Sequence, residues 1–158
     1  MKGIFSVLVE NRSGVLSKTA GLFARRGFNI DSLAVGETDD PATSNMTIVS
    51  TGDKRTIEQI EKQLNKKVDI IKVRRLEEKH CIERELLLIK VSHNKANRAD
   101  ILNICAIIGA NAAQVSAQSM IIEFCGEPER INELIELLRP YGIMEVMRSG
   151  TLALQKDV

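Results

Sequence analysis

The residues of this chain that are best suited to hold a small ligand lie in the turn Glu10-Asn11-Arg12-Ser13-Gly14-Val15-Leu16. A strand-like run, Ile4 to Val9, precedes the turn, and apolar residues at helical spacing follow it. A strand that enters a helix through such a turn leaves backbone N–H groups without intrahelical partners, and the helix dipole adds partial positive charge. The turn can therefore hold a carboxylate or a phosphate. The pattern is equally consistent with an ordinary helix start that Ser13 caps.

The elements around this turn alternate between strand and helix patterns. We expect strands at 3–10, 29–37, 45–51 and 68–76, and helices at about 15–26 and directly after Gly52-Asp53. This order, β-α-β-β-α-β, predicts the ferredoxin-like arrangement, in which an antiparallel sheet carries both helices on one face.

A charged passage with few apolar residues follows at 77–84, and the same order of elements then repeats without a visible repeat of the sequence. The first strand of the second half, Glu85 to Ser92, is apolar almost throughout, as expected of a strand covered on both faces. We therefore predict an α+β protein of two ferredoxin-like βαββαβ units, at 1–76 and 85–158, joined by a linker at 77–84.

Composition excludes several classes of protein. The 22 Lys and Arg residues nearly balance the 21 Asp and Glu residues, so no overall field attracts the chain to nucleic acid or to an anionic membrane. No apolar run is long enough to span a bilayer and no export signal is visible, so we expect a cytoplasmic protein. The widely spaced Cys81, Cys105 and Cys125 form no CxxC pair, and we interpret them as reduced thiols rather than zinc ligands.

Catalytic patterns are weak. His80 and His93 each stand without a second histidine at ligand spacing, and Asp39-Asp40 is typical of a solvated turn. One enzyme hypothesis starts from Arg12, because acylphosphatases share the split fold and hold a phosphoryl group with an arginine and a helix-start loop. The chain lacks their longer glycine-rich loop.

RNA-binding RRM modules also share the βαββαβ order, but the two predicted central strands offer only Phe5 for base stacking.

The remaining function class is a binding module. The strand at 29–37 is expected at the edge of the sheet, where the same strand of a second copy can pair with it around a two-fold axis. That pairing brings Asn29 and Ile30 of one chain beside the 11–16 turn of the other. A small α-amino acid suits this seam: its carboxylate faces the N–H groups of Gly14, Val15 and Leu16, its ammonium meets asparagine carbonyl oxygens, and its side chain meets Ile30 and Leu16.

A set of short segments stands out along the chain: Glu10 to Ser17, Leu22-Phe23, Arg26 to Ile30, Ser32-Leu33, Thr38 to Pro41, Met46 to Ile48, Ile82 to Leu86 and Glu145 to Gly150. Together they closely resemble the small regulatory subunit of acetohydroxyacid synthase, also called acetolactate synthase, whose first half is an ACT domain. The likeness is dense over residues 2–75 and reaches nearly the whole length.

The resemblance implies a homodimeric, non-catalytic subunit that binds the large catalytic subunit, raises its activity and makes it sensitive to valine. It implies that the thiamine diphosphate, FAD and Mg belong to that partner and that this chain holds no cofactor. It places valine at the seam between two ACT domains, on Asn11, Gly14, Val15 and Leu16 of one chain and Asn29 and Ile30 of the other. A free-standing amino-acid-binding ACT protein with another target is the remaining alternative.

Overall fold

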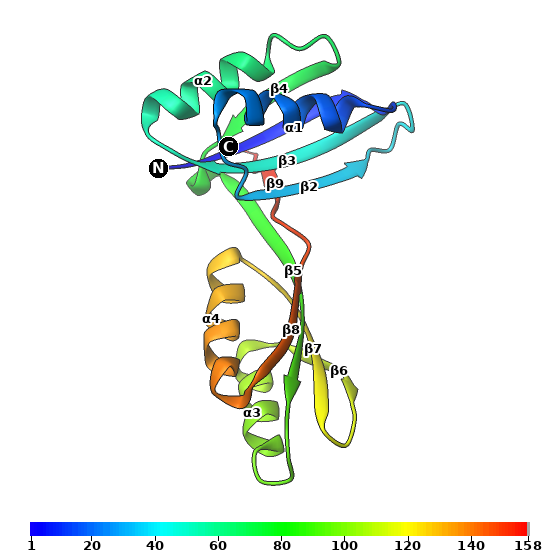
Figure 1. Cartoon of the computed structure of the whole chain (residues 1–158), viewed down its shortest axis with the longest axis vertical. Coiled ribbons are helices and arrows are strands. Elements are labelled where there is room, and N and C mark those ends of the chain that lie inside the picture. Colours follow the sequence, from blue (N-terminus) through cyan, green and yellow to red (C-terminus); the bar gives the residue numbers. More distant parts are fainter. Residues whose placement is uncertain (158) are drawn as a thin grey trace. The chain divides into compact units, whose positions relative to one another are not determined.

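The computed structural model describes residues 1–157 and divides the chain into two compact units (Figure 1). The first contains residues 1–82 together with the C-terminal segment from Thr151, and the second contains residues 83–150. Each unit has the order βαββαβ with an antiparallel sheet, so the predicted fold class is confirmed.

The first unit contains the candidate site. Its elements are β1 (Lys2–Glu10), α1 (Val15–Arg26), β2 (Ser32–Glu37), β3 (Thr43–Thr51), α2 (Lys54–Leu64) and β4 (Ile70–Leu76). The sheet order is β2-β3-β1-β4, and both helices cover one face of it (Figure 1). Apolar residues of the strands and of both helices, among them Phe5, Phe23 and Ile60, form the core between these layers. As predicted, β2 is an edge strand, although it begins at Ser32 rather than at residue 29.

The second unit repeats this topology. Its elements are β5 (Cys81–Ser92), α3 (Arg98–Ile108), β6 (Asn111–Val115), β7 (Ser119–Gly126), α4 (Pro128–Leu138) and β8 (Ile143–Arg148), with short 3-10 turns at Glu78–His80 and Arg139–Tyr141. The strand order β6-β7-β5-β8 corresponds to that of the first unit, and α3 and α4 lie on one face of the sheet (Figure 1). The core forms on that face, around Leu87, Ile89 and Val91 of the central strand.

The predicted linker at 77–84 is shorter in the structure, because β5 already begins at Cys81. Cys81 is buried against Ile4, Val49 and Leu76 of the first unit. The charged residues that suggested a linker therefore occupy a 3-10 turn and the beginning of a long strand.

The structure also corrects the boundary of the second domain, which we predicted to run to residue 158. From Thr151 onward the chain belongs to the first unit, where it forms strand β9 (Leu152–Gln155). Ala153 packs on a small apolar cluster, and Thr151 N–H donates to Ser32 Oγ at 2.8 Å. This cluster lies on the face of the first sheet that the helices leave uncovered, and the C-terminal tail shields it from water.

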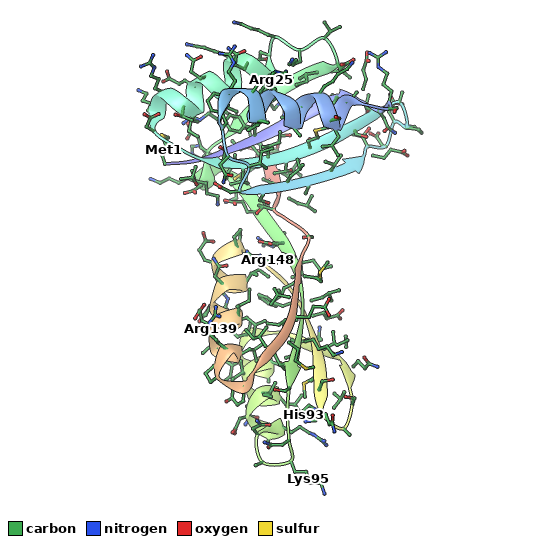
Figure 2. All side chains as sticks on the ribbon, in the orientation of Figure 1. Met1, Arg25, His93, Lys95, Arg139 and Arg148 are labelled. Carbon is green, nitrogen blue, oxygen red and sulfur yellow. The ribbon has the colours of Figure 1, made fainter. Side chains whose placement is uncertain are left out.

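A buried ion pair joins the beginning and the end of the second unit. Glu85 is only 4% exposed, and Arg148 donates to it through Nε at 2.6 Å and Nη2 at 2.8 Å (Figure 2). These hydrogen bonds raise the pKa of Arg148. The third guanidinium nitrogen donates to Asn132 Oδ1 at 3.0 Å, so the arginine ties β5, β8 and α4 together.

We expect Arg148→Met to lower the free energy of unfolding of the second unit by about 1–3 kcal/mol, less than for a fully buried pair because the side chain of Arg148 is 37% exposed. The loss arises because Glu85 keeps its buried charge without a partner. The double variant Glu85→Leu/Arg148→Met should recover much of it. Urea unfolding followed by circular dichroism measures both effects.

Arg139→Met is the matched control, since its ion pair with Glu136 is exposed on both sides and should contribute little to stability. Equal destabilisation by the two arginine substitutions would contradict the role given to the Glu85–Arg148 pair.

Candidate functional site

The turn before α1 leaves the start of the helix open. Gly14 occupies the N-cap position with φ +86°, and no side chain caps the helix. Ser13 is therefore not the cap. Within residues 1–157 the N–H groups of Gly14 and Leu16 have no hydrogen-bond acceptor, and that of Val15 has only the distant Arg12 carbonyl at 3.4 Å. This helix start thus presents open backbone donors of the kind that can bind an anion, and anion binding there stays a prediction.

The side chains of this turn differ in what they can offer a ligand. Val15 is 4% exposed and packs in the core, so only its backbone faces outward. Leu16 is 45% exposed and supplies an apolar surface beside the open N–H groups. A Cβ at Gly14 would meet nothing within 4 Å, so space is free in front of the turn.

Asn11 is fixed by two hydrogen bonds that sequence reasoning did not anticipate. Its Nδ2 donates to Pro41 O at 2.9 Å and to Glu37 Oε2 at 3.2 Å. Both amide hydrogens are thereby used inside the chain, which leaves the Oδ1 acceptor for a donor from outside. The carboxylate of Glu37 adds negative charge beside the Asn11 side chain. Because Asn11 and Glu37 are distant in the sequence, only the fold reveals that they are neighbours.

Asn29 and Ile30 lie between α1 and β2. Asn29 is exposed, and its Nδ2 donates to Asp31 Oδ1 at 2.6 Å while its backbone carbonyl accepts from Ser50 Oγ at 2.6 Å. Ile30 is half-buried and packs against the core of the first unit. Here too a carboxylate, that of Asp31, stands beside an asparagine.

The two groups of predicted site residues are at opposite ends of α1. The helix has 12 residues, which corresponds to a length of about 18 Å. The turn at 11–16 leads into the helix and includes its first residues, and Asn29 and Ile30 follow the helix after the C-cap at Gly27. A single chain therefore does not bring the six residues into contact with one small ligand.

Arg12, the starting point of the enzyme hypothesis, is held by carboxylates. Its guanidinium forms ion pairs with Glu10 and Asp69, both at 2.5 Å, and Asp69 also accepts from Lys18 Nζ at 3.0 Å. Hydrogen bonds from Lys18 and Arg12 lower the pKa of Asp69. The positive charge of Arg12 is thus compensated by carboxylates, so its guanidinium is not free to hold a phosphoryl group.

The remaining chemistry-bearing residues are scattered over the described part of the chain. His80 Nδ1 lies 3.2 Å from Glu77, and the buried His93 places Nε2 2.8 Å from Ser116 O. Asp40 Oδ1 accepts from Ala42 N–H in a turn, as its sequence context predicts. Residues 1–157 contain no cluster of three metal-ligating side chains, and no helix among them is long and apolar enough to cross a membrane.

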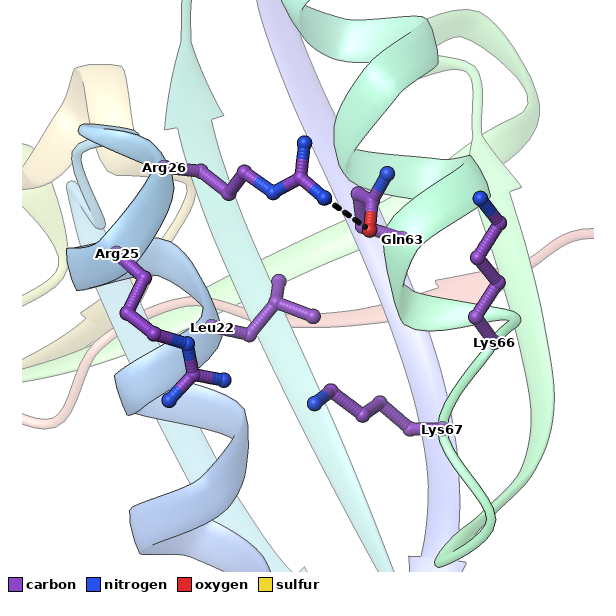
Figure 3. Close-up of a pocket in the computed structure, with 6 residues that line it drawn as sticks. All are labelled: Leu22, Arg25, Arg26, Gln63, Lys66 and Lys67. Atoms are coloured by element: carbon purple, nitrogen blue, oxygen red, sulfur yellow. Dashed lines mark hydrogen bonds between the residues drawn. The ribbon is translucent and has the colours of Figure 1, made fainter.

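A basic hollow of about 150 Å³ lies at the other end of α1 (Figure 3). Arg25 and Arg26 line it from α1, and Gln63, Lys66 and Lys67 line it from the end of α2. Figure 3 shows Arg26 reaching across to Gln63, with an Nη2 to Oε1 distance of 3.1 Å. Cations at helix C-termini complement the helix dipoles, which accounts for this arrangement without a ligand.

Two family models match the chain. The model described as "AHAS small subunit-like ACT domain" matches residues 5–72, and the model described as "Small subunit of acetolactate synthase" matches residues 84–157. Together they cover both units.

Whole-length relatives agree with these models. The probable acetolactate synthase small subunit of Methanothermobacter thermautotrophicus is 44% identical over 97% of this chain and 92% of its own length. The acetolactate synthase small subunit of Bacillus subtilis is 42% identical over 97% of this chain and 90% of its own. The crystal structure of the small subunit from Thermotoga maritima superposes with a TM-score of 0.93 at 38% identity, covering 100% of this chain and 99% of that one. This chain therefore belongs to the family of acetolactate synthase small subunits.

Proposed function

We propose that this chain binds the catalytic large subunit of acetolactate synthase, raises its activity and confers feedback inhibition by valine bound between two ACT domains. The observation that carries the proposal is the open start of α1 at Gly14, which follows in sequence shortly after Asn11 with its unused acceptor oxygen. An α-amino acid presents one anion and one cation on the same carbon, and this turn offers a complementary group to each.

Each part of valine has a counterpart. The carboxylate accepts from the N–H groups of Gly14, Val15 and Leu16, where the helix dipole favours negative charge. The ammonium donates to Asn11 Oδ1, and the neighbouring carboxylate of Glu37 attracts its positive charge. The isopropyl group packs on the exposed Leu16 and on Ile30 of a second chain.

The edge strand explains how the second chain reaches this turn. β2 begins just after Ile30 and ends at Glu37, whose side chain contacts Asn11. Antiparallel pairing of β2 with the same strand of a second copy places the beginning of one strand beside the end of the other. Ile30 of each chain then lies near the 11–16 turn of its partner, and two equivalent sites form.

The chemistry of the synthase is assigned to the large subunit in this proposal. Thiamine diphosphate, FAD and Mg are expected to be bound there, and this chain acts through valine-dependent packing of its ACT dimer. A coupling free energy of roughly 1–3 kcal/mol between effector and partner is typical of such regulation.

Gly14→Asp should abolish feedback while leaving activation of the large subunit intact. The new carboxylate stands where the carboxylate of valine binds, and we expect the affinity for valine to fall roughly 10- to 100-fold. Calorimetry of the isolated chain with valine, leucine and isoleucine measures binding, and valine inhibition of the reconstituted holoenzyme measures feedback.

Gly14→Asn is the matched control, because asparagine has nearly the size of aspartate and accepts the same φ of +86°. It should lose only a small part of the affinity. If both variants bind valine equally well, the carboxylate of the ligand does not face this turn.

The partner distinguishes this proposal from a free-standing ACT protein. A tagged copy of this chain should retain purified large subunit on a resin and raise its acetolactate-forming activity several-fold. Retention of no large subunit over a range of salt concentrations would favour the free-standing alternative, whatever the result of the calorimetry.

A further inference from the structure

The described residues cover the central strand of the second unit, β5, on one face only. Leu87, Ile89 and Val91 point toward α3 and α4 and are at most 1% exposed. Leu86 and Leu88, on the opposite face, are 44% and 41% exposed. The expectation of a strand covered on both faces is therefore confirmed on one side only.

The covered face ends in a buried histidine. His93 continues the inward alternation of Ile89 and Val91, so its ring points to the helix side of the sheet, and it is 6% exposed. Its Nε2 lies 2.8 Å from Ser116 O. Because a carbonyl oxygen only accepts, Nε2–H is the donor, and Nδ1 of the neutral ring is then an acceptor. Within residues 1–157 this Nδ1 is buried and has no hydrogen-bond partner.

Arg98 begins α3 at the same end of the unit, five positions after the histidine. It stands three positions before Ile101, on the stripe of the helix that faces the core. Among the described residues its Nε is buried without a partner, and neither Asp100 nor any other carboxylate forms an ion pair with it. A cation at a helix N-terminus opposes the helix dipole, so helix stability does not account for Arg98.

The backbone at this helix start also offers unused donors. The side chains of Asn94 and Asn97 accept only from N–H groups of their own turn, and no side chain caps α3. Over the described part of the chain, the N–H groups of Ala99 and Asp100 have no acceptor. These open donors and the cation beside them favour an oxyanion, whereas the free acceptor of the histidine requires a neutral donor.

We propose that the start of α3 binds a small 2-hydroxy carboxylate. The carboxylate accepts from the open N–H groups of the helix and from the guanidinium of Arg98. The hydroxyl group donates to Nδ1 of His93, which an ionised carboxylate cannot do because it has no proton to give. One small molecule thereby satisfies both buried nitrogen atoms.

The turn before α1 in the first unit has the corresponding position, since each of these helices follows the first strand of its unit. The two positions differ in the charge that accompanies the acceptor. The carboxylate of Glu37 beside Asn11 suits an ammonium group, whereas Arg98 repels an ammonium group and leaves a hydroxyl as the suitable donor. The new site uses residues of the second unit alone, so it can fail without affecting the proposed function.

Nuclear magnetic resonance of the isotope-labelled full chain tests the site, with L-lactate, propionate and L-alanine as probes at constant ionic strength. The three probes differ only in the group on the second carbon, which is a hydroxyl, a hydrogen or an ammonium. L-Lactate should shift the ring signals of His93 and the Nε–H signal of Arg98, and bind roughly tenfold or more tightly than propionate, which leaves Nδ1 unpaired. L-Alanine should shift neither signal.

Arg98→Gln should abolish the response of His93 to L-lactate without lowering the stability of the chain, because it removes a cation from a helix N-terminus. Lys95→Gln is the matched control, since it removes the same charge from an exposed position of the turn before α3 (Figure 2). It should keep the preference for L-lactate over propionate. Gly14→Asp should also keep it, which separates this site from the valine seam. Urea unfolding establishes that each variant is folded.

Three results would overturn the proposal. L-Lactate that shifts neither His93 nor Arg98 would mean that this helix start holds no such ligand. Equal binding of propionate would mean that the hydroxyl group is not recognised. Tighter binding of hydrogenphosphate, which also carries a hydroxyl beside its negative charge, would assign the site to a phosphate group instead.

Discussion

The length of α1 is the constraint on which the proposed valine site depends. The helix holds the open turn at Gly14 and the Asn29-Ile30 segment at its two ends, about 18 Å apart. In the proposed site neither end encloses the ligand by itself, since the turn offers backbone donors and Leu16 and the far end offers the apolar side chain of Ile30. In the proposed dimer, a second copy joined along β2 brings the two ends together. The proposed binding of valine therefore depends on dimerisation.

The second unit has the same topology as the first but lacks the features of the candidate site. Its first and last strands are joined by the buried pair between Glu85 and Arg148, which holds the central strand β5 against β8. The start of its α3 has no side-chain cap either, but no strand-end asparagine with a free acceptor accompanies it as Asn11 accompanies Gly14. The repeated fold thus combines a half that carries the proposed valine site with a half whose exposed feature is an apolar sheet face.

Much of this could be predicted from the sequence, because periodicity and turn residues report local structure. The helix ending at Gly27 and the cap at Asp53 are confirmed, the latter by a 2.7 Å hydrogen bond from Thr56 N–H. Long-range pairing was not predictable. Glu85 looks like a solvated residue until Arg148 is placed beside it, and the tail after Thr151 returns to Ser32 across 119 positions of sequence. The six proposed valine contacts came from the resemblance and from edge-strand geometry, and their role remains a prediction.

Mixing two inactive variants tests most directly whether the site belongs to two chains. Gly14→Asp repels the carboxylate of valine at the turn, and Ile30→Asp removes the apolar contact from the second chain. Each homodimer should therefore bind valine poorly. When equal amounts of the two variants are refolded together, each heterodimer has two valine sites. One site carries both substitutions, and the other carries neither. Calorimetry should then recover near-native valine affinity in about a quarter of all sites. No recovery, in a mixture shown by mass spectrometry to contain heterodimers, would contradict a site shared between chains.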